Sequence, residues 1–249
     1  MSAETTFDAV IIGAGAAGLM CGATAGQRGR KVLLLERSPR VGQKVLISGG
    51  GRCNFTNLRV EPKNYLSDNP HFCKSALSRF TPLDFIKLIE KHGIAYHEKA
   101  PGQLFCDDRA HRIVDLLKAE CKAGGVTLKT GCAIKRIEKK DLFSVQTDST
   151  TYTAPALVVA TGGLSYPETG ATGFGYEIAA QFGLAVIPPR PGLVPLVYSP
   201  GDRRKFGDLA GIIQVDGDFG VPLDAGDGFD GDGSGHLALH HNLLTEKPD

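Results

Sequence analysis

The sequence predicts an α/β fold in which helices alternate with the strands of a parallel sheet. An apolar run at residues 7–12 leads into a glycine-rich turn at residues 13–18, a helical stretch to about Arg28 and a second apolar run at residues 31–35. A further apolar run, at residues 156–160, also ends in glycines. Strand, turn, helix and strand in this order form one βαβ unit, whose two strands lie parallel. The further run is expected to join the same sheet.

Each glycine of the first turn has a separate physical task. Gly13 permits a tight turn, Gly15 lets the backbone approach a pyrophosphate, and Gly18 lets the helix pack closely on the preceding strand. The helix that starts here points unpaired N–H groups and its positive dipole end at the same pyrophosphate. Glu36 ends the second strand, where an acid accepts hydrogen bonds from an adenosine ribose. The pattern predicts a dinucleotide-binding site.

Composition narrows the classes of partner. The length allows a sizeable core and one or two domains. With 28 basic and 27 acidic residues the net charge is +1, so no global field favours nucleic acid or anionic lipid, and no nucleic-acid partner is expected. No apolar run is long enough to span a bilayer, so no membrane span is expected. The sequence leaves the oligomeric state open.

The N-terminal region and the cysteines indicate a compartment. The first apolar run is short, interrupted by glycines and without a basic leader, so a signal peptide is not expected. The six cysteines have no CxxC spacing, which is typical of free thiols in a reducing environment. A cytoplasmic location is therefore expected.

A second glycine-rich stretch follows the βαβ unit at residues 48–54. Its three successive glycines are expected to expose backbone N–H groups that no side chain shields, which suits an anion or a closely approached flat ring. Arg52 adds a charged fork for a phosphate or an oxyanion. A flexible loop is the alternative interpretation. A binding function is favoured because the triple glycine stands directly before Arg52, Cys53 and Asn54.

The middle of the chain alternates predicted helices and strands. Residues 74–92 have a helical pattern, in which Thr81 supplies an N-cap, Pro82 the first helical position and Asp84 an acid in the first turn. The other elements expected are a helix at residues 110–123, strands at residues 126–128, 133–137, 143–147 and 152–153, a turn at residues 138–141, and a helix opened by residues 170–175.

A change in composition predicts the domain boundaries. The stiff connector at residues 188–192 is typical of a domain exit, so residues 1–190 are expected to form the dinucleotide-binding domain. Residues 191–215 are expected to begin a second, mainly β domain that is incomplete. Residues 216–249 are rich in Asp and Gly and have few apolar groups to bury, so a disordered tail is expected. The strands expected in the second domain are residues 193–198 and 211–215.

Metal binding is not expected. Residues 230–235 imitate the opening of an EF-hand loop, but His241 stands where the bidentate glutamate is required. His236 and His240 are four apart without the glutamate of an HExxH motif. No chemistry is assigned to the histidines in or beside the predicted helices, which are His92, His97 and His111.

Five stretches together resemble one family of proteins. They are residues 13–18, 48–57, 102–108, 160–165 and 174–176. In these stretches the chain is similar to the bacterial NAD(P)/FAD-dependent oxidoreductases of the BaiN/RdsA-like, or aminoacetone oxidase, family. The similarity runs from about Phe7 to about Ile213, and the residues from about Gln214 onward match nothing expected of the family. Because family members are much longer, the resemblance implies a truncated chain with a divergent C-terminal tail.

The resemblance implies a Rossmann-like domain that binds FAD rather than NAD at the first turn, with NAD(P)H as electron donor. The 48–54 loop would lie near the flavin and its pyrophosphate, the turn at residues 161–163 would line the same crevice, and the backbone near Ala133 would meet the adenine. The residues expected to bind the cofactor are Gly13, Gly15, Ala16, Ala17, Gly18, Glu36, Arg37, Lys44, Ser48, Gly49, Gly50, Gly51, Arg52, Cys53, Asn54, Ala133, Thr161, Gly162 and Gly163.

The leading hypothesis is an FAD-dependent oxidoreductase with an unknown small-molecule substrate and no assigned catalytic residue. Backbone N–H groups of the 48–54 loop would stabilise the reduced flavin anion. Cys53 is interpreted as a structural thiol rather than a redox thiol, because no resolving cysteine is adjacent in sequence. Two alternatives stay open: an NAD(P)-binding module without flavin, and a non-catalytic fragment that cannot hold FAD.

Overall fold

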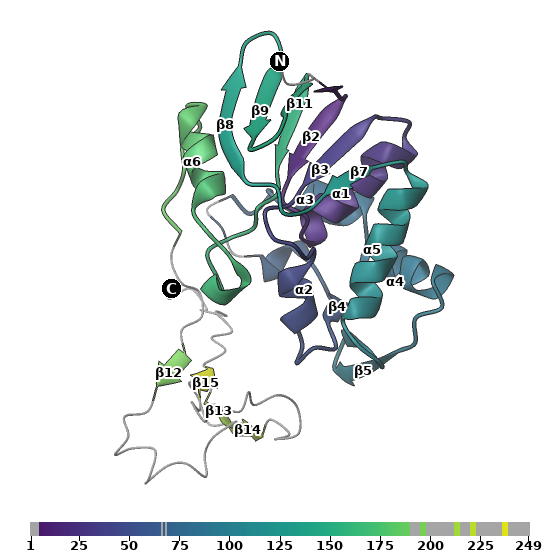
Figure 1. The fold of residues 1–249 in the computed structure, drawn as a ribbon. Coiled ribbons are helices and arrows are strands. Elements are labelled where there is room, and N and C mark those ends of the chain that lie inside the picture. The colour runs from purple at the N-terminus through teal and green to yellow at the C-terminus, as the bar shows by residue number, and fades with distance from the viewer. Residues whose placement is uncertain are drawn as a thin grey trace. The chain divides into compact units, whose positions relative to one another are not determined.

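The computed structural model describes residues 5–65, 67 and 69–189, and four short strands beyond them (Figure 1). The chain divides into two compact units, Met1–Val186 and Ile187–Asp249. Within the described residues, no helix is both long and apolar enough to cross a bilayer.

A parallel sheet forms the centre of the first unit. Its strands lie in the order β11 (Ala156–Val159), β2 (Ala9–Ile12), β3 (Val32–Leu35) and β7 (Thr127–Lys129), and every neighbouring pair is parallel. The two central strands, β2 and β3, are short runs of β-branched residues and leucine that are buried on both faces, whereas the edge strands β7 and β11 are more exposed. The predicted α/β fold with a parallel sheet is confirmed.

The two faces of this sheet are packed differently. Side chains alternate across a strand, so Ile11 and Leu34 join one buried cluster while Val10 and Leu33 join another. Helices α1 (Ala16–Gln27) and α5 (His111–Ala123) cover the first face and supply residues to its cluster. The Cys121 thiol donates to the Leu19 carbonyl oxygen at 3.1 Å and joins the two helices. Both helices were expected from the sequence.

A second sheet packs on the other face. Its strand order is β1 (Thr5–Thr6), β10 (Thr151–Ala154), β9 (Phe143–Thr147) and β8 (Ile134–Lys139), and β8, β9 and β10 form an antiparallel meander. Helix α6 (Phe174–Gln181) follows the short turn η2 (Pro167–Thr169) and lies beside β8 (Figure 1). The turn expected at residues 138–141 is shorter than predicted, because β8 pairs as far as Lys139.

A third sheet was not predicted. It is antiparallel, with strand order β4 (Asn54–Asn57), β6 (Gln103–Cys106) and β5 (Tyr96–Ala100). Two further short elements flank it, α2 (Gln43–Ile47) and the 3₁₀ turn η1 (Pro62–Asn64). The turn between β5 and β6 contains Pro101 and Gly102, and a Pro-Gly pair marks such turns in sequence. That pair was the available signal for this hairpin.

The single helix expected at residues 74–92 is two helices, α3 (Lys74–Arg79) and α4 (Pro82–Lys91). The ring of Pro82 excludes Thr81 from the helical region, and Thr81 is extended, with φ −88° and ψ 164°. The predicted N-cap is present. The Thr81 hydroxyl accepts from the Asp84 N–H at 3.3 Å, and the Asp84 carboxylate accepts from the Thr81 N–H at 2.9 Å.

Replacing Thr81 with alanine is expected to cost about 1 kcal/mol of unfolding free energy, because the Asp84 N–H loses its side-chain acceptor and the Asp84 carboxylate loses the Thr81 hydroxyl donor. Urea denaturation measures the loss as a lower midpoint. Thr24→Ala is the matched control, since Thr24 is an exposed helix residue whose hydroxyl only bonds back to the Met20 carbonyl oxygen. Equal midpoints for the two variants would contradict the capping role.

Beyond residue 189, the second unit is described only at four strands. Strand β12 (Pro195–Val197) pairs with β15 (His236–Ala238), and β13 (Ile212–Gln214) pairs with β14 (Gly220–Pro222); both pairs are antiparallel. Strands were expected at the positions of β12 and β13. The remaining residues of the expected tail, including the EF-hand-like stretch and His241, lie outside the described residues.

Candidate dinucleotide-binding site

Gly13 and Gly18 are required by the fold of the first turn. Gly13 has φ +97°, and a Cβ atom there would lie 2.5 Å from the Ala160 carbonyl oxygen at the end of β11. A Cβ atom on Gly18 would overlap the carbonyl oxygen of Gly13. The turn therefore packs against both the start of α1 and the end of β11. The glycine turn after β2 thus lies beside the glycine turn after β11, as expected from the sequence.

Gly15 is not required by packing. Its backbone is extended, with φ −78° and ψ −171°, and a Cβ atom there would meet no described atom of the chain within 4 Å. Helix α1 begins at the next residue and carries no acid in its first turn. A helix N-terminus without acidic side chains attracts anions. The turn thus fits a pyrophosphate. The pyrophosphate would approach the backbone at Gly15, where the absence of a side chain leaves the N–H groups accessible.

Glu36 links the glycine turn to the chain after β3. One carboxylate oxygen accepts from the Ala14 N–H at 2.7 Å, and the other accepts from the Ser38 N–H at 2.8 Å. A carboxylate offers about four acceptor positions, so two remain for ribose hydroxyl groups. Glu36 is half-buried at the strand end, as a ribose-binding acid would be.

A cavity of about 470 Å³ opens beside Glu36. Backbone bonds from Gly131 to Ser38, at 3.0 Å, and from Cys132 to Glu36, at 2.9 Å, bring the chain before β8 alongside the chain after β3. Five residues expected from the sequence line the cavity: Gly13, Glu36, Arg37, Ala133 and Thr161. The lining residues that sequence reasoning missed are Ile12, Leu35, Cys132, Ile134, Gly170, Thr172, Phe174 and Glu177.

Two cations connect this region to the chain after β11. The Lys44 ammonium donates to the Gly163 carbonyl oxygen at 2.7 Å and to the Ser165 hydroxyl at 3.2 Å. The Arg37 guanidinium donates to the Gly170 carbonyl oxygen. Of the three residues expected in the second glycine turn, Thr161 lines the cavity, whereas Gly162 and Gly163 do not.

The 48–54 loop lies outside the cavity lining. Its three glycines have φ values of 58°, 65° and 81°, which glycine adopts at little cost. The N–H groups of Gly51 and Cys53 donate to the Ser48 carbonyl oxygen. The expectation of three exposed N–H groups is therefore corrected to two, those of Gly49 and Gly50, which donate to no group in the described part of the chain.

The loop is nevertheless tied to the glycine turn. The Gly42 N–H at the start of α2 donates to the Ala14 carbonyl oxygen at 2.9 Å, and α2 leads directly into Ser48. The Ala110 N–H donates to the Gly51 carbonyl oxygen at 2.7 Å, which fixes the far side of the loop to the start of α5. One connected backbone therefore joins the two predicted binding segments.

Cys53 and Cys106 are both buried beside this loop. Cys53 has φ +56°, which is uncommon for a residue with a side chain. Burial raises the pKa of the Cys53 thiol, and its hydrogen bond with Ser48 opposes the shift. Burial also raises the pKa of Cys106, to about 12. Both side chains are accordingly neutral thiols at pH 7, and neither is activated as a nucleophile.

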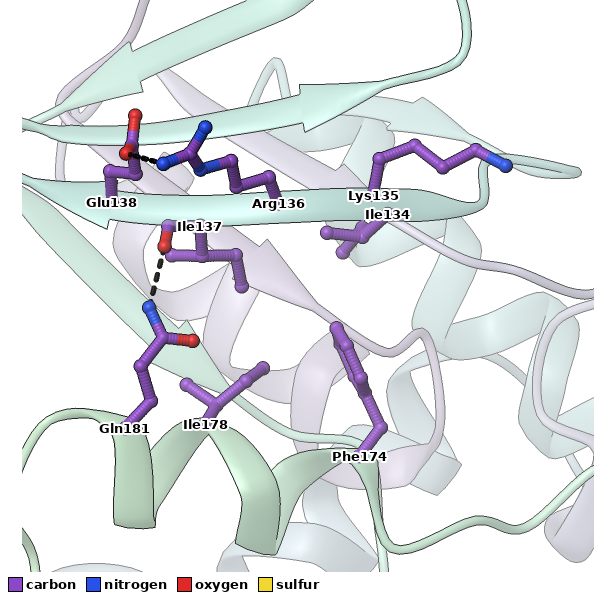
Figure 2. Close-up of a pocket in the computed structure, with 8 residues that line it drawn as sticks. All are labelled: Ile134, Lys135, Arg136, Ile137, Glu138, Phe174, Ile178 and Gln181. Atoms are coloured by element: carbon purple, nitrogen blue, oxygen red, sulfur yellow. Dashed lines mark hydrogen bonds and ion pairs between the residues drawn. The ribbon is translucent and has the colours of Figure 1, made fainter.

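A second cavity, of about 350 Å³, lies between β8 and α6. Figure 2 shows Phe174 and Ile178 pointing from α6 towards β8, while Arg136 and Glu138 extend from the opposite side of the strand. The two cavities share Ile134 and Phe174. The Gln181 amide donates to the Ile137 carbonyl oxygen at 2.6 Å and holds the helix on the strand. Four of the eight lining residues are apolar and four are polar or charged. Because the Gln181 bond and the rings and branches of α6 occupy the side that faces β8, we assign this space to the packing of α6 on the strand.

Two histidines in the described region bond to carboxylates and so have structural contacts. His92 bonds to Glu120 at 2.7 Å and His97 to Asp107 at 2.6 Å. Among the described residues, no group of three or more histidine, cysteine, aspartate or glutamate side chains is placed to hold a metal ion.

Comparison with known proteins identifies relatives in sequence and in fold. The family model described as the HI0933-like protein Rossmann domain matches residues 7–228. This match extends past Ile213, where the sequence resemblance was expected to end. The chain is 56% identical over 207 residues to a protein of Escherichia coli strain K12 named ribosomal RNA dihydrouridine synthase, and the match covers 83% of this chain and 52% of that protein.

Two more distant likenesses agree. A protein of Clostridium scindens named 3-dehydro-bile acid delta(4,6)-reductase is 27% identical over 206 residues, which cover 81% of this chain and 49% of that protein. Glycine oxidase from Geobacillus kaustophilus has a similar fold, with a TM-score of 0.52, 16% identity, and coverage of 77% of this chain and 60% of that one. The chain thus spans about half the length of both relatives. The family model matches most of the chain, which therefore belongs to the HI0933-like protein Rossmann domain family.

Proposed function

We propose that this chain is the FAD-binding part of a flavin-dependent reductase. The observation that carries the proposal is the cavity that brings Glu36, Ala133 and Thr161 together at the carboxyl end of the parallel sheet, next to the open face of Gly15. Ligands of such sheets bind at this edge, at the turn that follows the first strand. The cavity volume suits a nucleoside, since ligand pockets range from about 300 to 1,000 Å³.

In this proposal each part of FAD has its own partner. The α1 N-terminus, with Gly15, Ala16 and Ala17, holds the pyrophosphate, and the free acceptor positions of Glu36 take the ribose hydroxyl groups. The backbone at Ala133 meets the adenine. The N–H groups of Gly49 and Gly50 are the donors available to the flavin end. The positions of Arg37 and Lys44, bonded to the chain after β11, make them positioning residues for the rim of the site.

FAD, when bound and reduced by two electrons from NAD(P)H, would supply the hydride for reduction of the substrate. The protein binds the cofactor, orients it and excludes water. The buried neutral thiols of Cys53 and Cys106 are packing residues in this proposal. NAD(P)H is proposed as the electron donor on the family resemblance alone. The sequence has one glycine fingerprint, which we assign to FAD, and no second fingerprint that would bind NAD(P)H.

The substrate that we propose is a uridine in RNA. The relative that is 56% identical is named ribosomal RNA dihydrouridine synthase, and conversion of uridine to dihydrouridine adds a hydride and a proton across one carbon–carbon double bond. The bile acid reductase is 27% identical, so we place a steroid-like substrate second. An RNA substrate replaces the small-molecule substrate expected from sequence alone.

The Gly15→Val variant tests the cofactor site. Because a Cβ atom at this position meets no described atom within 4 Å, the variant is expected to fold. Its FAD affinity is expected to fall at least tenfold, because the branched side chain blocks the approach of the pyrophosphate to the backbone. Visible absorbance after gel filtration with added FAD measures retention, and thermal unfolding measures the fold. Ala119→Val, on the exposed side of α5, is the matched control and should bind FAD like the parent chain.

Two outcomes would contradict the proposal. Unchanged FAD binding in Gly15→Val would mean that the pyrophosphate does not approach this turn. A parent chain that stays colourless with FAD but binds NAD(P)H, measured by fluorescence, would assign the site to a nicotinamide dinucleotide without flavin.

A further inference from the structure

We propose that residues 58–80, between β4 and α4, form a surface that binds unpaired RNA nucleotides. We call these residues the 58–80 segment; residues 66 and 68 lie outside the described part of the chain, and the proposal does not rest on them. The proposal rests on the RNA substrate proposed above and names the part of the chain that recognises it. The segment contains η1 and α3 and supplies no residue to either buried cluster.

The segment exposes aromatic side chains. Phe72 is 81% exposed and Tyr65 is 50% exposed. Neither ring stacks on another ring in the described part of the chain. By contrast, Phe55 and Phe85 in the adjoining elements pack together at a ring distance of 5.9 Å. Single exposed apolar residues are ordinary, but two free aromatic faces in one short segment offer stacking platforms for bases.

The fold brings the two aromatic residues into one region. The Cys73 thiol lies 3.8 Å from the Pro62 carbonyl oxygen, which joins the start of α3 to the start of η1. Phe72 directly precedes Cys73, and the Tyr65 N–H donates to the same Pro62 carbonyl oxygen at 3.1 Å. Both aromatic residues therefore flank one backbone contact.

The same segment carries exposed cations. Arg59, Lys74 and Arg79 are exposed, and within the described residues none lies within ion-pair distance of a carboxylate. Lys63 is also exposed and pairs with Glu61 at 2.7 Å. Aromatic faces combined with unpaired cations are the features that hold single-stranded nucleic acid, through base stacking and phosphate contacts.

The first unit is basic, although the net charge of the whole chain is close to zero. Residues 1–186 contain 23 basic and 17 acidic side chains, a net charge of +6, whereas residues 187–249 contain 5 and 10, a net charge of −5. The expectation that no nucleic acid binds was drawn from the sum of +1, in which the two units cancel. The net charge of +6 on residues 1–186 favours phosphate contacts by this unit.

The position of the segment suits a substrate contact. Strand β4 leads from the 48–54 loop to residue 58, and its four residues span about 13 Å. The segment therefore begins about 13 Å from the loop, and in this proposal Tyr65 and Phe72 hold nucleotides that flank a uridine presented there. Such contacts fix the register of the RNA.

The test measures binding of a fluorescein-labelled single-stranded oligouridine to the full chain, by fluorescence anisotropy at several salt concentrations. The variants are Phe72→Ala and Lys74→Gln. The matched controls, Leu142→Ala and Lys140→Gln, remove an exposed apolar side chain and an exposed cation from the turn after β8. FAD absorbance is recorded on each sample.

Phe72→Ala is expected to weaken binding about tenfold, which is the loss of one stacked base. Lys74→Gln is expected to reduce the salt dependence, log K against log salt, by about 0.7, the contribution of one phosphate contact to a single strand. Both controls should keep the affinity and slope of the parent chain.

Equal losses of RNA affinity in the variants and the controls would contradict the proposed RNA-binding surface. A parent chain that binds vesicles of anionic phospholipid but no RNA would contradict it as well. The FAD reading separates this inference from the proposed cofactor. A parent chain that retains FAD and binds RNA independently of Phe72 overturns the surface alone, whereas a chain that never retains FAD overturns the flavin assignment.

Discussion

Replacing Gly18 with alanine is expected to lower the unfolding free energy of the chain by about 3 kcal/mol. The added Cβ atom would overlap the Gly13 carbonyl oxygen, and a backbone oxygen in a tight turn cannot move aside as a flexible side chain can. Helix α1 would have to withdraw from β2, which would open the core formed by Leu19 and Ala23 on the helix and Ile11 on the strand.

Gly22→Ala is the matched control, because it makes the same change one turn further along α1. A Cβ atom at Gly22 would lie 3.6 Å from Val126 and 3.7 Å from Ile11 and Leu34, which is ordinary contact. This variant should be neutral or more stable, since alanine favours a helix over glycine by up to about 1 kcal/mol.

Urea denaturation without added cofactor distinguishes the two variants by their midpoints. A Gly18→Ala midpoint equal to that of Gly22→Ala would show that the turn adjusts and that its tight packing is not required. Together with Gly15→Val, the series separates two kinds of glycine in one motif: Gly13 and Gly18 serve the fold, whereas Gly15 serves the ligand.

The sequence was sufficient for the parallel sheet because its signals are local. Each of β2, β3 and β11 is a short apolar run, and the glycines after β2 and β11 can be interpreted without knowledge of the rest of the chain. The capping box at Thr81 is likewise confined to four residues. The prediction of one helix at residues 74–92 was wrong, because the helical pattern continues across Pro82, although this proline breaks the helix into α3 and α4.

The third sheet was missed because pairing there is not local. Strand β4 pairs with β6, about fifty residues further along the chain, and Asn54 and Asn57 carry little strand propensity. The site shows the same division. Glu36 and Ala133 were expected from motif and analogy and meet in one cavity, whereas Phe174 and Glu177 enter it because α6 folds back over β8. No local pattern could place them there.

Glu120 is the most strongly perturbed carboxyl group in the described part of the chain. It is 6% exposed and joins three helices. The Lys91 ammonium, at 2.8 Å, and the His92 ring, at 2.7 Å, bond to one carboxylate oxygen, and the Gln27 amide donates to the other at 2.7 Å. Chiefly through Lys91, these bonds lower the pKa of Glu120 to about 2 despite its burial.

This shift predicts the pH dependence of stability. In the unfolded chain the pKa of this carboxyl group is about 4.3. Between that pH and about 2, the unfolded chain therefore binds more protons than the folded chain. The stabilisation is therefore complete above about pH 5 and is lost as the pH falls towards 2. We expect Glu120→Gln to lose about 2 kcal/mol at pH 7, less than the full shift implies, because Lys91 is largely solvated.

Urea midpoints of the parent chain and Glu120→Gln between pH 7 and pH 3 measure the effect, and their difference should narrow below pH 4.5. Asp115→Asn is the matched control, since it removes an exposed carboxylate from the same helix, paired only with Lys118 at 3.4 Å, and should change little. A loss in Glu120→Gln that is the same at every pH would mean that the shape of the side chain, rather than its charge, holds α1, α4 and α5 together.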